Sequence, residues 1–133
     1  MDGHGARLIN LAFRVADVAQ TEDGVARTAG WSKRAVHEID GERFLEAAFG
    51  DVRINFFRSA LYDDADAADA PGFLHASFAV PDLGAVLDDP VWRARLVWGP
   101  GVIRGGFGHR RIAFFEPFPG CRIELMEEIH DRA

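Results

Sequence analysis

Apolar and polar residues alternate with a period of two over residues 8–18 and again over residues 73–83, and the two segments match without a gap. This alternation is typical of a half-buried β-strand. Each segment reaches an aspartate, Asp17 or Asp82, just before a pattern that favours a helix, and aspartate is a common helix N-cap. The sequence therefore predicts that a strand followed by a helix occurs twice.

A second match follows in the same order along the chain. VRINFF, residues 52–57, aligns with CRIELM, residues 121–126, and this alignment pairs Asn55 with Glu124. Two matches in the same order are less expected by chance than one. We therefore predict an internal duplication within a single domain, 1–133. It consists of module one at about 7–58, an acidic linker at 59–72 and module two at about 73–128.

Each module is predicted to contain a strand, a helix and three further strands. The expected elements are a helix over about 18–29, strands over 32–39, 42–49 and 52–58, a helix over 82–89, a helical turn from 90, and strands over 95–99, 110–116 and 121–127. With a helix on one face of each sheet, the opposite faces are free to line a concave surface. The predicted fold class is α+β, with two βαβββ modules forming a concave mixed sheet and helices on its outer face.

Strand alternation also predicts which side chains point away from the helices and into the concave surface. The set consists of Asn10, Ala12, Arg14, Arg53, Asn55, Phe57, His75, Ser77, Ala79, Arg122, Glu124 and Met126. Four polar members occupy positions that the duplication relates in pairs, because Asn10 aligns with His75 and Asn55 with Glu124. These four residues are the candidates for chemistry.

Composition narrows the classes of function. The chain has 133 residues and a net charge of −6, and the absence of basic runs argues against a nucleic-acid partner. No apolar run approaches the roughly 18 residues of a membrane span, and the N-terminus lacks the order of a secretory signal, so we expect no membrane partner and a cytoplasmic location. The lone Cys121 excludes an intrachain disulfide and a cysteine-based zinc cage.

Three segments resemble the vicinal oxygen chelate superfamily, which includes glyoxalase I, extradiol dioxygenases, fosfomycin-resistance transferases and metal-free bleomycin-binding proteins. They are LHASFAVPDL (74–83), RIAFFEPFPGCRIELME (111–127) and FGDVRINFF (49–57). The resemblance covers nearly the whole chain and implies paired βαβββ modules and a homodimer. It also implies a small molecule as substrate or ligand.

The resemblance further implies one divalent ion, with a ligand from the first and last strands of each module. Those positions are Asn10, Asn55, His75 and Glu124. Module two keeps the usual His and Glu, whereas module one has asparagines, whose carboxamides offer only neutral oxygens.

Several hypotheses for the site stay open. In one, His75 and Glu124 hold Zn, Mn, Fe or Ni in a glyoxalase-like or dioxygenase-like enzyme, with Glu124 in the catalytic machinery. In another, the two residues hydrogen-bond to each other and to a ligand, and the protein binds or sequesters small molecules without metal, as bleomycin-resistance proteins do. In a third, Glu124 alone is a general base on a substrate bound without metal.

Further residues are candidates for substrate binding. Arg14, Arg53 and Arg122 would pair with an anionic substrate, and Phe57 and Ser77 would line the pocket. His109 belongs to the glycine-rich segment 99–109, which is either a mobile loop near the substrate or an ordinary hairpin connection.

Overall fold

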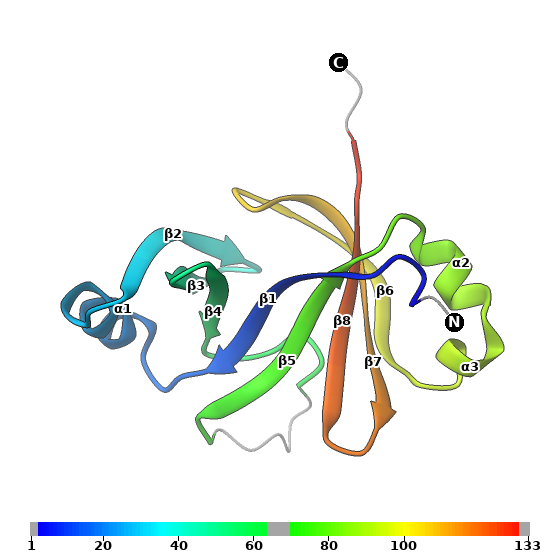
Figure 1. The fold of residues 1–133 in the computed structure, drawn as a ribbon, viewed down its shortest axis with the longest axis horizontal. Helices are drawn as coiled ribbons and strands as arrows, with labels where there is room; N and C mark the ends of the chain where they lie inside the picture. Colours follow the sequence, from blue (N-terminus) through cyan, green and yellow to red (C-terminus); the bar gives the residue numbers. More distant parts are fainter. Residues whose placement is uncertain (1–2, 64–69, 131–133) are drawn as a thin grey trace. The chain divides into compact units, whose positions relative to one another are not determined.

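The computed structural model describes residues 3–63 and 70–130, and the chain separates into two compact units, Asn10–Leu74 and Met1–Ile9 with His75–Ala133. The described elements are eight strands and three helices, shown in Figure 1. No described helix has both the length and the apolar character needed to cross a bilayer.

Module one contains β1 (Arg7–Arg14), α1 (Val18–Arg27), β2 (Trp31–Ile39), β3 (Glu42–Phe49) and β4 (Val52–Phe57). The strands lie in the order β2-β3-β4-β1, and β1 runs parallel to β4 while the other pairs are antiparallel. Asp17 caps α1 by accepting a hydrogen bond from the Gln20 amide. The β2–β3 hairpin turns at Asp40 and Gly41, which have φ values of 51° and 83°, as the Asp-Gly pair predicts.

Module two contains β5 (Gly72–Ala79), α2 (Leu83–Asp88), α3 (Pro90–Arg93), β6 (Leu96–Gly105), β7 (Gly108–Phe118) and β8 (Cys121–Glu128). The strands lie in the order β5-β8-β7-β6, with β5 parallel to β8. Asp82 caps α2, and Asp89 caps α3, whose first position is Pro90. Both modules therefore have a strand, a helix and three further strands in the same order, and module two adds the short helix α3.

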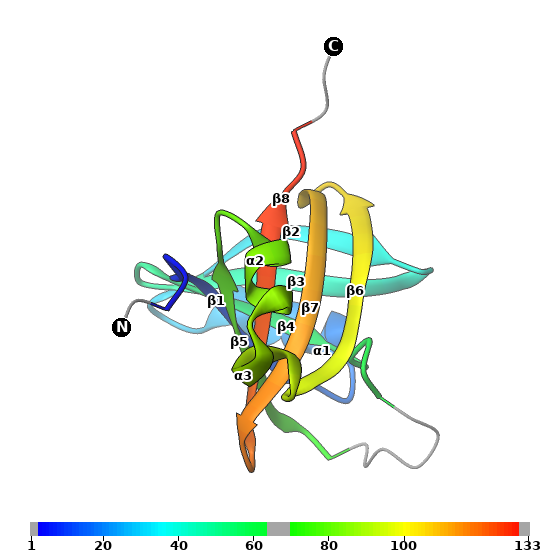
Figure 2. The same ribbon diagram turned by 90° about the vertical axis from the view of Figure 1, so that its right-hand side faces the viewer.

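Each module buries one face of its sheet beneath its own helices. In module two, Leu83, Val86 and Leu87 of α2 pack with strand residues that include Phe115 and Leu125, and Figure 2 shows α2 and α3 in front of this sheet. In module one, Val18 and Val25 of α1 pack with strand residues that include Leu45. We call the opposite face of each sheet its polar face. The α+β class and the paired βαβββ modules are confirmed.

Two expected boundaries differ from the structure. Helix α1 ends at Arg27, two residues before the expected end, where Thr28 adopts an extended conformation and Gly30 has a φ of 87°. The glycine-rich segment 99–109 was expected as a loop or a hairpin connection, and most of it is strand, with β6 continuing through Gly105 and β7 beginning at Gly108. The ladder bonds between β6 and β7 extend through this segment because each glycine still offers its backbone groups.

Candidate functional site

Three of the predicted residues lie together on the polar face of module two. His75 and Ser77 come from β5, and Glu124 comes from the adjacent β8, where it is the ladder partner of Ser77. The Ser77 hydroxyl donates a 2.7 Å hydrogen bond to Glu124 Oε1, and His75 Nε2 lies 3.8 Å from the same oxygen. All three side chains are buried. The sequence prediction that His75 and Glu124 are neighbours is therefore confirmed within this module.

An aromatic ring closes the side of this cluster. Phe114 of β7 is the ladder partner of Glu124, and its ring meets the His75 imidazole edge to face with the centroids 5.0 Å apart. Trp98 of β6 also contacts Phe114, with 5.8 Å between the ring centroids. The polar groups are thus held by apolar neighbours, which strengthens their electrostatic interactions.

Burial shifts the pKa values of both titratable groups. Desolvation, with a further contribution from the Arg122 charge, lowers the pKa of His75 to about 3. Desolvation raises the pKa of Glu124 to about 7, although the Ser77 hydrogen bond and the Arg110 charge act in the opposite direction. At neutral pH the imidazole is neutral, and the carboxyl group is poised to take up or release a proton.

The raised pKa of Glu124 has a consequence for stability. The carboxyl group is neutral in both the folded and unfolded states below its ordinary pKa of 4.5, and it becomes costly to ionise in the folded state as the pH rises towards about 7. Glu124→Gln is therefore expected to raise the free energy of unfolding at about pH 8 by up to roughly 3 kcal/mol, and to leave it nearly unchanged at about pH 4. Urea unfolding in the presence of a chelator measures this difference.

The control for that experiment lies on the same strand. Glu128 is exposed, so Glu128→Gln should give no comparable pH-dependent gain. An equal gain for Glu124→Gln at both pH values would contradict the burial of an ionised Glu124.

The polar face of module one has different chemistry. Asn10 is buried and Asn55 is half-buried, on the adjacent strands β1 and β4. The Oδ1 atom of Asn55 is fully buried and has no hydrogen-bond partner among the described residues. Arg53, two residues earlier on β4, is exposed. The Asn55 oxygen could therefore accept a hydrogen bond or bind a cation.

A glutamate that the sequence analysis did not select lies beside Asn55. Glu46 is the ladder partner of Asn55, and its Oε1 atom lies 2.8 Å from His37 Nε2 while Oε2 accepts a 3.0 Å bond from Arg34 Nε. Burial alone would raise the pKa of Glu46, but the hydrogen bonds to His37 and Arg34 outweigh it and hold the pKa below its ordinary value. Alternation with Leu45, which packs beneath α1, could have placed Glu46 on the polar face.

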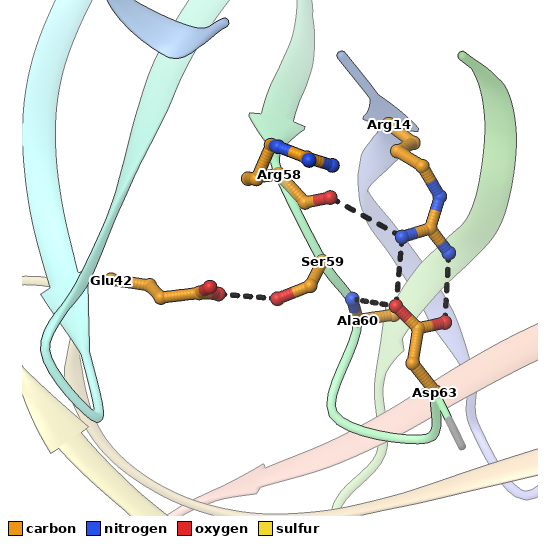
Figure 3. Close-up of polar contacts among 6 residues, drawn as sticks. All are labelled: Arg14, Glu42, Arg58, Ser59, Ala60 and Asp63. Carbon is orange, nitrogen blue, oxygen red and sulfur yellow. Dashed lines mark hydrogen bonds and ion pairs between the residues drawn. The ribbon is translucent and has the colours of Figure 1, made fainter. Parts of the chain in front are cut away.

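Arg14 is engaged by a carboxylate of the chain itself, as Figure 3 shows. Its two terminal nitrogens each lie 2.7 Å from an oxygen of Asp63, and one of them also donates to the Arg58 carbonyl at 3.2 Å. The Ala60 amide donates to the same carboxylate at 2.8 Å. The buried guanidinium therefore fastens the start of the linker, residues 60–63, to the end of β1.

The other candidates for substrate binding are dispersed. Phe57 stacks on Phe44 with the centroids 4.6 Å apart, and Arg122 pairs with Glu116 at 3.1 Å. His109 lies at the start of β7, where its Nδ1 is 2.9 Å from an Arg104 nitrogen. Their roles in substrate binding stay predictions.

The donor set can be compared with the needs of a divalent ion. Across residues 3–63 and 70–130, no three His, Cys, Asp or Glu side chains are grouped as a metal site. Module two offers two strong ligands, the neutral His75 imidazole and the Glu124 carboxylate. Two such ligands fit a weakly held ion with several positions left for water or substrate.

Comparisons with known proteins identify related folds. No protein-family model and no curated protein match the sequence. The solved structure of methylmalonyl-CoA epimerase from Mycobacterium tuberculosis matches with a TM-score of 0.68 and 24% identity, over 92% of this chain and 88% of that one. A variant of the Streptomyces coelicolor epimerase in complex with 2-nitronate-propionyl-CoA matches with a TM-score of 0.70 and 19% identity, over 96% and 97%.

A third structure, methylmalonyl-CoA epimerase in complex with methylmalonyl-CoA and NH4+, matches with a TM-score of 0.69 and 21% identity, over 92% of this chain and 94% of that one. These epimerases have the vicinal oxygen chelate fold. The chain therefore shares that fold along nearly its whole length.

Proposed function

We propose that this protein is a small-molecule enzyme of the vicinal oxygen chelate superfamily that moves a proton at a carbon beside a carbonyl group. The observation that carries the proposal is the buried cluster in which Glu124 accepts a hydrogen bond from Ser77 and lies 3.8 Å from His75. A carboxyl group with perturbed protonation beside a neutral imidazole is typical of sites for proton transfer. The likeness to methylmalonyl-CoA epimerases supports the same class of reaction.

In this proposal His75 and Glu124 hold a divalent ion, and Asn10 and Asn55 stay predictions as further oxygen donors. When bound, the ion would polarise the substrate carbonyl and stabilise the negative charge that develops on its oxygen. Ser77 orients the carboxylate by its hydrogen bond, and Phe114 fixes the plane of the imidazole. An acyl-CoA thioester is the substrate class that we propose, because the similar epimerases bind such ligands.

A specific observation favours a second version of the site. The pKa of Glu124 is about 7, which suits a general base at neutral pH without any ion. In that version the carboxylate takes the proton itself, and the neutral His75 donates a hydrogen bond to the carbonyl oxygen of the substrate.

The proposed function is tested by incubating the chain with methylmalonyl-CoA in D2O and following deuterium incorporation at the carbon between the two carbonyl groups. Incorporation faster than in buffer supports the proposal. Incorporation at the buffer rate, with and without added Mn²⁺, Co²⁺ or Zn²⁺, contradicts this substrate. Tight binding of methylmalonyl-CoA without deuterium incorporation would instead indicate a protein that binds or sequesters the small molecule without reaction.

Metal binding separates the two versions. Isothermal titration of chelator-treated protein with Mn²⁺ or Zn²⁺ should show one site, and His75→Ala is expected to weaken that site at least about tenfold because it removes the only imidazole of the pair. His130→Ala is the matched control, because His130 is exposed near the end of the described chain. Equal affinity in the parent and His75→Ala would exclude His75 as a ligand and leave the metal-free version.

A further inference from the structure

Arg110 of β7 shares the polar face of module two with the candidate site. The β7–β8 register pairs Phe114 with Glu124 and Arg110 with Glu128, and side chains two residues apart on a strand point to the same side. The positive charge of Arg110 also acts on Glu124, where it favours the ionised carboxylate and so lowers the pKa. Arg110 is thus part of the electrostatic surroundings of Glu124.

The guanidinium of Arg110 makes only weak contacts with the described residues, and one of them is a cation–π contact with its carbon 5.9 Å from the centroid of the Phe107 ring. Its Nε atom is buried and has no hydrogen-bond partner, and one terminal nitrogen lies 3.4 Å from Met126 Sδ, a weak acceptor. The other terminal nitrogen is 3.9 Å from a carboxylate oxygen of Glu128, whose side chain is 61% exposed. Such a long, solvated pair contributes little.

Arg14 and Arg110 differ in their hydrogen-bond partners. Arg14 holds Asp63 through two bonds of 2.7 Å. The side chain of Arg110 is only 19% exposed, yet no carboxylate of the described residues holds it by two such bonds. A guanidinium keeps its charge at every accessible pH, and its planar fork of donors matches the two oxygens of a carboxylate.

We propose that Arg110 is the residue that binds the carboxylate of a substrate whose anionic group lies next to the reacting carbon. The inference rests on the proposed function, because that substrate is the one on which Glu124 acts. The carboxylate would pair with the two terminal nitrogens of Arg110, because the Nε atom is buried. Binding would then place the neighbouring carbon on the Glu124 side of the sheet.

The test uses malonate as the probe and malonamide, its neutral isostere, as the control ligand. Titration calorimetry of chelator-treated protein should show malonate binding and much weaker malonamide binding. Arg110→Met is expected to weaken malonate binding at least about tenfold, the loss typical of a charged hydrogen-bond partner. The malonate affinity of Arg110→Lys should lie between those of the parent and Arg110→Met, because lysine keeps the positive charge but lacks the two parallel donors of a guanidinium.

The matched control is Arg93→Met, since Arg93 is an exposed residue on α3 and its replacement removes the same charge from the same module. It should bind malonate like the parent. Thermal unfolding of each variant confirms that the fold is kept. Parent-like malonate binding by Arg110→Met, or equal binding of malonate and malonamide by the parent, overturns the inference.

The same variants separate this inference from the proposed function. If methylmalonyl-CoA exchanges no deuterium but malonate binding depends on Arg110, the proposed reaction fails and the anion site stands. If both the parent and Arg110→Met exchange deuterium into methylmalonyl-CoA with the same KM, the proposed reaction is supported and the proposed role of Arg110 is wrong.

Discussion

Replacing Glu124 by glutamine is expected to slow deuterium incorporation into methylmalonyl-CoA about a hundredfold or more. Glutamine keeps the shape of the side chain and an oxygen that can accept the Ser77 hydrogen bond. It cannot take up a proton at neutral pH, and it is a weaker metal ligand than a carboxylate. The loss is therefore expected in both the metal-dependent and the metal-free versions of the site.

The measurement is the initial rate of incorporation at saturating substrate, for parent and variant, with and without added Mn²⁺. Glu38→Gln is the control, because Glu38 is an exposed carboxylate on β2. A Glu124→Gln variant that exchanges deuterium at the parent rate would remove Glu124 from the reaction.

Asp63→Ala is expected to lower the free energy of unfolding by about 3–5 kcal/mol, the range found when one partner of a buried ion pair is removed. The Arg14 side chain is 7% exposed, and its buried charge would lose both 2.7 Å bonds to Asp63. The Ala60 amide would lose its acceptor as well. Urea unfolding of the purified variant at neutral pH measures the change.

A double substitution identifies the cause of this loss. Replacing Arg14 by methionine in the Asp63→Ala background removes the buried charge and should restore part of the lost stability. If Asp63→Ala unfolds at the same urea concentration as the parent, the pair seen in Figure 3 does not hold the linker in solution.

The sequence was sufficient to predict most of the fold. The strand periods and the Asp17 and Asp82 caps predicted both modules, and the strand over 42–49 has the predicted bounds. These features are local, because alternation and capping depend on residues a few positions apart. The same alternation predicted that His75, Ser77 and Glu124 share one type of face, and the structure adds that β5 pairs with β8.

Other parts of the site depend on contacts that no local pattern encodes. The partner of Arg14 is Asp63, which lies among several acidic linker residues that look equivalent in the sequence. The position of Glu46 beside Asn55 follows only from the β3–β4 register, and the orientation of His37 follows from its contact with Glu46. The strand character of residues 99–105 depends on pairing with β7, which outweighs the preference of glycine for turns.

The parallel pairing of β5 with β8 also bears on how the protein acquires its site. Ser77 and Glu124 are 47 residues apart in the chain, whereas β7 and β8 are joined by a tight turn at residues 119 and 120. Short-range hairpins close in microseconds, and contacts between distant segments form later because they require the closure of a long loop. We therefore expect the β6–β7–β8 meander to assemble first and the imidazole to reach the carboxylate only when β5 docks, which makes the appearance of the site a reporter of late folding.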